Sequence, residues 1–175
     1  MELDISSYKL KIGSNAIDFN LKGIDGKTYS LKDFKGKKAV AVIFTCNHCP
    51  YAKAYEDRIV ALQGEFNNKG VSFVAINSND AAKYPQDSFE NMKIRAKGIN
   101  FNFPYLYDET QGIARKYGSQ VTPEIFLFDE NLKLIYHGSV DNNMEHPEKA
   151  IPFFRNAITA LLNGEEIKAE ETSAF

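Results

Sequence analysis

The most informative stretch of the sequence is Lys38-Ala39-Val40-Ala41-Val42-Ile43-Phe44-Thr45-Cys46-Asn47-His48-Cys49-Pro50, in which an apolar run leads directly into two cysteines. An apolar run without alternation is typical of a strand that is buried on both faces of a sheet. The apolar residues that follow recur at the spacing of one helical face: Tyr55, Ile59, Leu62 and Phe66. The cysteines therefore lie where a buried strand enters a helix, which we expect to begin near Asn47.

A second buried strand is predicted over residues 71–76, which completes a parallel strand-helix-strand unit. Upstream, two alternating runs at 17–21 and 27–31 flank Asp25-Gly26, a pair that favours a β-hairpin. Downstream, an apolar and aromatic stretch at 101–107 is interrupted by Pro104 and is not assigned to an element.

The rest of the chain contains three predicted helices and a second hairpin. The helices cover residues 88–97, 109–117 and a C-terminal segment with apolar positions from Ile151 to Leu162; the hairpin strands cover 124–128 and 132–137. This order predicts an α/β protein with a mixed central sheet and helices on both faces. It is the thioredoxin topology with a β-hairpin extension at residues 1–36, a helical insertion after the second core strand and a charged tail at 163–175.

Composition restricts the function classes further. The 175 residues fit one domain, 1–175, and a formal net charge of −2 with scattered lysines argues against a nucleic-acid binder. No apolar run is long enough to span a membrane, and the N-terminus does not resemble a signal peptide. We therefore expect a cytoplasmic protein that binds neither nucleic acid nor membrane.

The two cysteines, Cys46 and Cys49, are the only ones in the chain, so they cannot form a disulfide scaffold. A helix N-terminus stabilises a thiolate, which predicts a lowered pKa for Cys46 and a role as nucleophile. Cys49 lies one turn on and is the expected resolving thiol. An imidazolium at His48 would favour the thiolate further, although a solvated residue capping the helix is the alternative for His48.

Thr122-Pro123 directly precedes the strand predicted at 124–128. In this topology such a proline lies opposite the cysteine pair, and a cis peptide bond would expose backbone polar groups to an extended substrate. Pro123 therefore joins the expected catalytic residues. The expected substrate-binding residues are Thr45, Asn47 and Thr122.

Metal binding is a weaker interpretation of the same cysteines. Structural zinc requires four ligands, and the sequence has neither a second Cys-x-x-Cys nor a His-x-x-x-His. A copper-binding chaperone would combine the cysteines with a distant histidine, for which His137 and His146 are candidates, although surface or strand imidazoles explain both as well. We expect no resident metal and no cofactor.

Several motifs together resemble the thioredoxin-like branch of the AhpC/TSA (alkyl hydroperoxide reductase and thiol-specific antioxidant) family. They are Ala16-Ile17-Asp18-Phe19, Asp25-Gly26-Lys27, Leu31-Lys32-Asp33-Phe34-Lys35-Gly36, Phe44-Thr45-Cys46-Asn47-His48-Cys49-Pro50, Asn77-Ser78-Asn79-Asp80, Tyr84-Pro85, Phe103-Pro104-Tyr105-Leu106-Tyr107-Asp108-Glu109 and Thr122-Pro123. The resemblance implies a thioredoxin fold, a redox-active Cys46–Cys49 disulfide and a cis bond before Pro123. The expected activity is thiol-disulfide exchange with protein or small-molecule substrates and an unidentified reductant.

Thiol-dependent peroxidase activity is the alternative that the family suggests. Typical peroxiredoxins carry a proline seven residues and a threonine or serine three residues before the reactive cysteine, whereas Ala39 and Ile43 occupy these positions before Cys46. Some relatives have a carboxylate three residues after the second cysteine, where this chain has Ala52. Glu56 and Asp57 are then the remaining, more distant candidates for proton transfer to Cys49.

Overall fold

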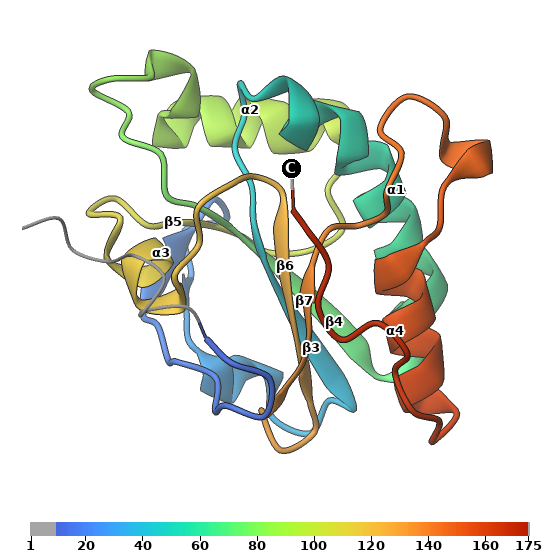
Figure 1. The fold of residues 1–175 in the computed structure, drawn as a ribbon. Coiled ribbons are helices and arrows are strands. Elements are labelled where there is room, and N and C mark those ends of the chain that lie inside the picture. The colour runs from blue at the N-terminus through green and yellow to red at the C-terminus, as the bar shows by residue number, and fades with distance from the viewer. Residues whose placement is uncertain (1–9, 175) are drawn as a thin grey trace, which may run out of the picture.

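The computed structural model describes residues 10–174, and within them one mixed sheet has the strand order β2-β1-β5-β4-β3-β6-β7 (Figure 1). Its strands are β1 (Leu21–Gly23), β2 (Thr28–Tyr29), β3 (Ala39–Phe44), β4 (Val71–Asn77), β5 (Tyr105–Tyr107), β6 (Glu124–Asp129) and β7 (Leu134–Gly138). Strands β3, β4 and β5 run parallel, whereas β6 pairs antiparallel with both β3 and β7.

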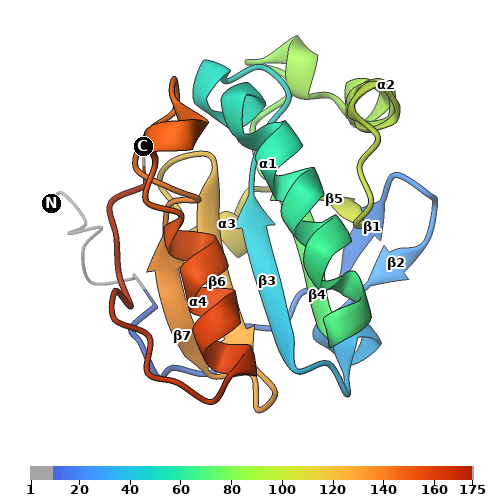
Figure 2. The same cartoon turned by 90° about the vertical axis from the view of Figure 1, so that its right-hand side faces the viewer.

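Helices cover both faces of this sheet. They are α1 (Pro50–Phe66), α2 (Phe89–Ile99), α3 (Gly112–Tyr117) and α4 (Phe153–Leu162). Figure 2 shows α1 and α4 in front of the sheet and α3 behind it. The mixed sheet with helices on both faces confirms the architecture predicted from the sequence, and α2 is the expected helical insertion after β4.

Strand β3 is buried on both sides, which explains its unbroken apolar sequence. Ala39, Ala41 and Ile43 pack in the core beneath α1 and α4. Val40, Val42 and Phe44, on the opposite side, pack with residues of α3. Burying one large aliphatic side chain stabilises a fold by about 1.5–3 kcal/mol, so a polar residue anywhere in β3 would be costly.

The register of β3 places the cysteine motif at the edge where three loops meet. Phe44 pairs with Ile76 of β4 on one side and with Glu124 of β6 on the other. The residues just beyond these positions therefore lie close together: the loop after β3, the loop after β4 and the segment before Glu124. This edge is where the sequence predicts the functional residues to be.

The N-terminal hairpin is shorter than predicted. Strands β1 and β2 pair antiparallel, but they cover only Leu21–Gly23 and Thr28–Tyr29. The expected strand at 17–21 is interrupted because the Asp18 carboxylate accepts the backbone N–H of Leu31 at 2.9 Å. Residues 1–9 of the expected extension lie outside the described residues.

The segment at 101–107 that the sequence left unassigned contains β5, which joins the hairpin to the central strands. Three residues are too few to show a periodic pattern. Pro104 fits beside this strand because only its carbonyl is needed, as acceptor of the Ala75 N–H at 2.9 Å. The following helix, α3, begins later than predicted because the Asp108 carboxylate accepts the N–H groups of Ile113 and Ala114.

Residues 170–172, in the expected tail at 163–175, lie along the outer edge of β7. Glu171 pairs with His137, and the Thr172 hydroxyl accepts the N–H of Ser139 at 3.0 Å. Gly138 allows this approach: its φ is +154°, and a Cβ there would lie 2.1 Å from the Thr172 hydroxyl oxygen. The end of the described chain thus packs as an additional segment against the sheet.

Candidate active site

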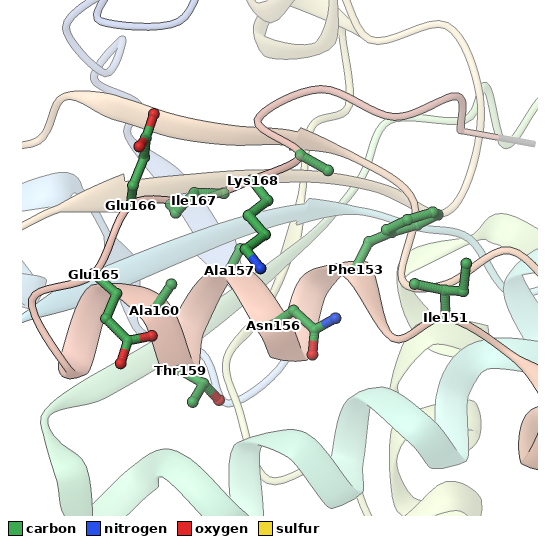
Figure 3. A pocket seen from close by; sticks show the side chains of 11 residues that line it. Ile151, Phe153, Asn156, Ala157, Thr159, Ala160, Glu165, Glu166, Ile167 and Lys168 are labelled. Atoms are coloured by element: carbon green, nitrogen blue, oxygen red, sulfur yellow. The ribbon is translucent and has the colours of Figure 1, made fainter.

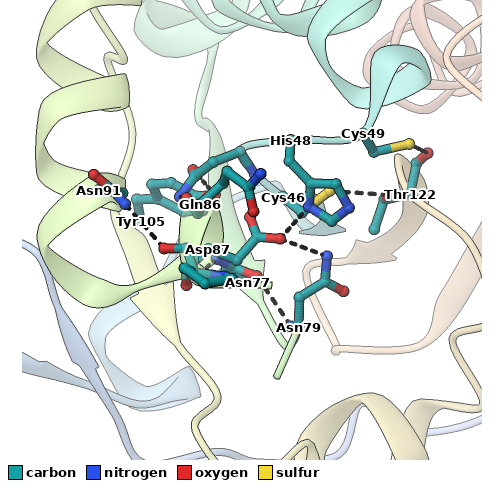
Figure 4. A network of polar contacts seen from close by, with 12 residues as sticks. Cys46, His48, Cys49, Asn77, Asn79, Gln86, Asp87, Asn91, Tyr105 and Thr122 are labelled. Atoms are coloured by element: carbon teal, nitrogen blue, oxygen red, sulfur yellow. Dashed lines mark hydrogen bonds and ion pairs between the residues drawn. The ribbon is translucent and has the colours of Figure 1, made fainter. Parts of the chain in front are cut away.

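The two cysteines meet Thr122 at the edge of the sheet (Figure 4). Cys46 is almost fully buried, at 1% exposure, and its Sγ lies 3.4 Å from the Thr122 hydroxyl oxygen. Cys49 is half-buried, and its Sγ lies 3.8 Å from the Thr122 carbonyl oxygen. Both thiols are free, and the Thr122-Pro123 peptide bond is cis, as predicted.

Helix α1 begins at Pro50, so the prediction that it begins near Asn47 is wrong. The reason is that Asn47 is held by other bonds. Its N–H donates to Asp87 at 2.6 Å, and its side-chain oxygen accepts the Tyr105 hydroxyl at 2.8 Å. Residues 45–49 therefore form a loop, and Pro50 occupies the first helical position, where no N–H is required.

The pKa of Cys46 is shifted upward, opposite to the direction predicted from the sequence. Burial raises the pKa of the thiol, and the negative charge of Asp87 raises it further. The hydrogen bond with Thr122 and the backbone N–H of Cys49 oppose this shift without overcoming it. Cys49 caps α1, so the start of the helix does act to lower the pKa of Cys46, but burial of the thiol outweighs it.

Asp87 is a fully buried carboxylate beside the cysteines that the sequence did not single out. It ends the 3₁₀ turn Pro85–Asp87 that precedes α2. One carboxylate oxygen accepts the Asn47 N–H, and the other accepts Asn79 Nδ2 at 2.9 Å and contacts His48 Nδ1. The sequence offers little signal for this role, because Asp87 lies far along the chain from the cysteine motif.

His48 is held in place from two directions. Its ring stacks on that of Tyr84, with centroids 4.8 Å apart and an interplanar angle of 16°, and its Nδ1 is bonded to Asp87. A carboxylate bonded to one ring nitrogen keeps the proton there and leaves the other nitrogen able to accept one. Within residues 10–174 no hydrogen bond uses Nε2 of His48. This nitrogen is therefore available for proton transfer.

Cys46, His48 and Asp87 bring a thiol, an imidazole and a carboxylate within 4.8 Å of one another. These donor types can bind a transition metal. Here, however, both oxygens of Asp87 already accept hydrogen bonds from protein groups, and the histidine is bonded directly to the carboxylate. The histidine and the carboxylate form a hydrogen-bonded acid-base pair beside the Cys46 thiol.

The histidines considered for copper lie elsewhere. His137 Nε2 is bonded to Glu124 at 2.9 Å, and His146 is exposed beside Glu148. In the described part of the chain, neither joins the cysteines in a group of metal donors. The placement of these histidines therefore gives no support to the copper hypothesis.

The carboxylates expected to serve Cys49 are also engaged elsewhere or exposed. Glu56 is buried and receives three hydrogen bonds from Arg95, of which the shortest is 2.6 Å. Burial raises the pKa of Glu56 even though Arg95 opposes the shift. Asp57 is exposed on α1. Asp87 and His48 are therefore the acid-base groups that lie closest to the redox residues.

A cavity of about 470 Å³ lies between α4 and the chain that follows it, away from the cysteines (Figure 3). All of its lining residues come after position 150. They contain neither a cysteine nor a histidine, and so this cavity belongs to a different part of the molecule from the redox residues.

The sequence matches the AhpC/TSA family over residues 12–137. This chain belongs to the AhpC/TSA family. It is 27% identical over 141 residues to the thiol-disulfide oxidoreductase ResA of Bacillus thuringiensis subsp. konkukian, covering 81% of this chain and 77% of that protein. It is 32% identical over 118 residues to the thioredoxin-like protein YneN of Bacillus subtilis, covering 67% of this chain and 65% of that protein.

Solved structures show the same fold. A hypothetical protein from Sinorhizobium meliloti superposes with a TM-score of 0.90 and 31% identity, covering 95% of this chain and 92% of that one. The thioredoxin domain of a thiol-disulfide oxidoreductase from Bacteroides vulgatus superposes with a TM-score of 0.63 and 22% identity, covering 74% of this chain and 89% of that one. The AhpC/TSA protein thus has a thioredoxin-like fold, and its relatives support oxidoreductase activity in general. In the described residues, no helix has both the length and the apolar character required to cross a membrane.

Proposed function

We propose that this AhpC/TSA protein is a thiol-disulfide oxidoreductase in which Cys46 and Cys49 alternate between the dithiol and the disulfide. The observation that carries the proposal is the meeting of both thiols at Thr122, beside a histidine held by a buried carboxylate. Thiol-disulfide exchange requires a thiolate, a second thiol nearby and a route for the proton. Cys46 and Cys49 supply the two thiols, and the His48–Asp87 pair beside them supplies the base that would take the proton.

In the reducing direction, Nε2 of His48 takes the proton of the Cys46 thiol, and the resulting thiolate attacks one sulfur of the substrate disulfide. The substrate S–S bond breaks, and the departing thiolate receives the proton from His48. The Cys49 thiol then attacks the Cys46 sulfur of the mixed disulfide, the bond from Cys46 to the substrate sulfur breaks, and the proton of Cys49 passes to the departing thiolate, which leaves as the second substrate thiol. The substrate gains two electrons, the protein becomes the Cys46–Cys49 disulfide, and a dithiol reductant restores it.

Asp87 acts in this scheme through His48. Its bond to Nδ1 keeps the imidazole in the tautomer that can accept a proton at Nε2, and its charge stabilises the imidazolium that forms. Asp87 is itself held by the Asn47 N–H and by Asn79. We therefore assign Asp87 as a positioning residue and His48 as the proton-transfer residue.

Thr122 and Pro123 form the opposite wall of the site. Thr122 precedes the cis bond to Pro123, and its hydroxyl contacts Cys46 while its carbonyl contacts Cys49. An extended substrate can pair with backbone groups presented in this way. We propose that the peptide segment at Thr122 and Pro123 aligns the substrate sulfur with Cys46.

The test uses the reduced protein and two single-cysteine variants. Oxidised glutathione should convert the wild type to a form lighter by two hydrogens in mass spectrometry, with no bound glutathione. Cys49→Ser should instead retain one glutathione, because the resolving thiol is absent, and Cys46→Ser should be much less reactive. If Cys46→Ser reacts as fast as the wild type while Cys49→Ser does not react, the assigned roles are reversed. If the wild type forms no internal disulfide, the proposed function is wrong.

A thiol-dependent peroxidase is the second candidate, because the chain is also 28% identical to chloroplastic peroxiredoxin Q of Gentiana triflora over 156 residues. The local structure argues against efficient peroxide reduction. Ala39 and Ile43, which replace the proline and threonine of typical peroxiredoxins, are fully buried in β3 and face away from any substrate. We expect hydrogen peroxide to oxidise Cys46 no faster than it oxidises a free thiolate in stopped-flow measurements, whereas a much faster reaction would favour the peroxidase.

A further inference from the structure

A second cavity, of about 300 Å³, adjoins the redox site at the edge of the sheet where β3 and β4 end. It lies between the loop after β4, helix α3 and the loop that leads to Pro123. The lining residues that matter here are Thr45, Ser78, Asn79, Arg115, Gln120 and Thr122. The cavity is large enough for a short polar chain but not for a folded protein segment.

This cavity shares its walls with the redox residues. Thr122 lines it and contacts the Cys46 sulfur at 3.4 Å. Asn79 also lines it and donates to Asp87 at 2.9 Å. A molecule held in the cavity would therefore lie directly beside Cys46 and its acid-base pair.

Thr45 lines this cavity and carries a buried hydroxyl. The residue is 4% exposed, and its hydroxyl has no hydrogen-bond partner among the described residues. An unpaired buried hydroxyl costs a fold about 1–3 kcal/mol, so such groups normally have a partner.

The charge of the cavity favours an anion. Arg115 is the only charged residue among the described residues that line it. Its guanidinium donates one bond to the Thr110 carbonyl at 2.6 Å, and within residues 10–174 it forms no salt bridge. The Ser78 hydroxyl already donates to the buried Asp108 carboxylate at 2.7 Å. The guanidinium therefore keeps donors in a geometry that suits a carboxylate.

We propose that this cavity binds the carboxylate-bearing arm of a small disulfide substrate, with the carboxylate at Arg115, while the substrate disulfide reaches Cys46 past Thr122. The inference rests on the proposed thiol-disulfide exchange and names its substrate class: low-molecular-weight disulfides with an acidic arm. Bond making and breaking at sulfur are those of the exchange described above, with Cys46 attacking and the acidic thiol leaving.

The test compares three disulfides that have two-carbon arms and similar size but differ in charge. 3,3′-Dithiodipropionate is anionic, 2-hydroxyethyl disulfide is neutral and cystamine is cationic. The measurement is the second-order rate at which the reduced protein reduces each of them. Arg115→Gln removes the cavity charge, and Lys116→Gln removes an exposed charge from the same helix without touching the cavity.

We expect the wild type to reduce the anionic disulfide fastest and cystamine slowest. Arg115→Gln should lower the anionic rate by about tenfold, the typical effect of one charge-assisted hydrogen bond, and leave the neutral rate unchanged. Lys116→Gln should change neither. Equal rates for the three disulfides, or an equal effect of Arg115→Gln on the anionic and neutral rates, would overturn this inference alone. Failure of the wild type to reduce any of them would overturn the proposed function as well.

Discussion

Replacing Asp87 by asparagine tests whether the buried carboxylate assists Cys46 through His48. Asparagine has nearly the same shape and can still accept the Asn47 N–H. Its amide NH₂, however, would face His48 Nδ1 and favour the tautomer with the proton on Nε2. We therefore expect Asp87→Asn to fold but to lose proton transfer from Cys46.

The size of the effect follows from the state of the Cys46 thiol. Burial raises the pKa of the Cys46 thiol, so the protonated thiol predominates at pH 7 and a base is needed to ionise it efficiently. A side chain that takes the proton in the transition state typically contributes a factor of about 100 or more. Removing the Asp87 charge also removes a repulsion on the thiolate, which acts in the opposite direction. We expect the net reaction at pH 7 to slow by about tenfold.

The assay is alkylation of Cys46 by iodoacetamide in the Cys49→Ser background, measured as a function of pH. The difference in rate between proteins with and without the Asp87→Asn substitution should shrink to less than about twofold near pH 10, because the thiol then ionises without a base. Asp80→Asn, which changes an exposed carboxylate of the loop after β4, is the matched control and should have no effect. An equal slowing at pH 7 and pH 10, or none at either, would refute the proton-transfer role.

Three further changes probe neighbouring features. His48→Ala should lower the reduction potential of the cysteine pair by roughly 10 to 40 mV in a glutathione redox titration, because an adjacent positive charge stabilises the thiolate. For Glu124, burial works against ionisation, but the hydrogen bonds from His137 and Ser119 outweigh it and hold the pKa below 4.5. The ionised carboxylate therefore stabilises the folded state at neutral pH, and this stabilisation is lost as the pH falls through the lowered pKa. The free energies of unfolding of Glu124→Gln and the wild type in urea should differ at pH 7 and converge in acid. Gly138→Ala should lower stability by at least about 1 kcal/mol by displacing Thr172. Gly98→Ala, in the last turn of α2 with open space around it, should raise stability by about 0.5 kcal/mol in thermal unfolding.

Local patterns predicted the centre of the fold because each central element is long enough to show its period. The unbroken apolar run at 39–44 and the helical spacing of residues 55–66 correspond to β3 and α1. Strand β5 contains three residues, so its place in the sheet depends on β1 and β4 rather than on its own sequence. Such elements become visible only once the long-range pairing is known.

The sequence predicted the cysteine motif and the Thr122-Pro123 segment as parts of one candidate site, but it did not predict Asp87. Cys46, Cys49 and Thr122 do meet, although they come from segments far apart in the sequence. The start of the helix was wrong because Asp87 and Tyr105 hold Asn47 in the loop, and the pKa direction of Cys46 was wrong because burial of the thiol raises it, with a smaller contribution from Asp87. No local rule relates a carboxylate in one loop to a thiol in another.

The outer edge of β7 has a consequence for how copies of this protein behave at high concentration. Residues 13–16 bond to the strand at one end, through the N–H of Gly13 to the Leu134 carbonyl at 2.8 Å, and residues 170–172 bond to it at the other. At the opposite margin of the sheet, β2 is two residues long. An exposed strand edge is what recruits another chain into cross-strand aggregation. Both outer edges of the sheet therefore leave few backbone N–H and C=O groups free to pair with a second copy of the chain. Removal of residues 165–175 should expose the edge of β7 and allow intermolecular strand addition.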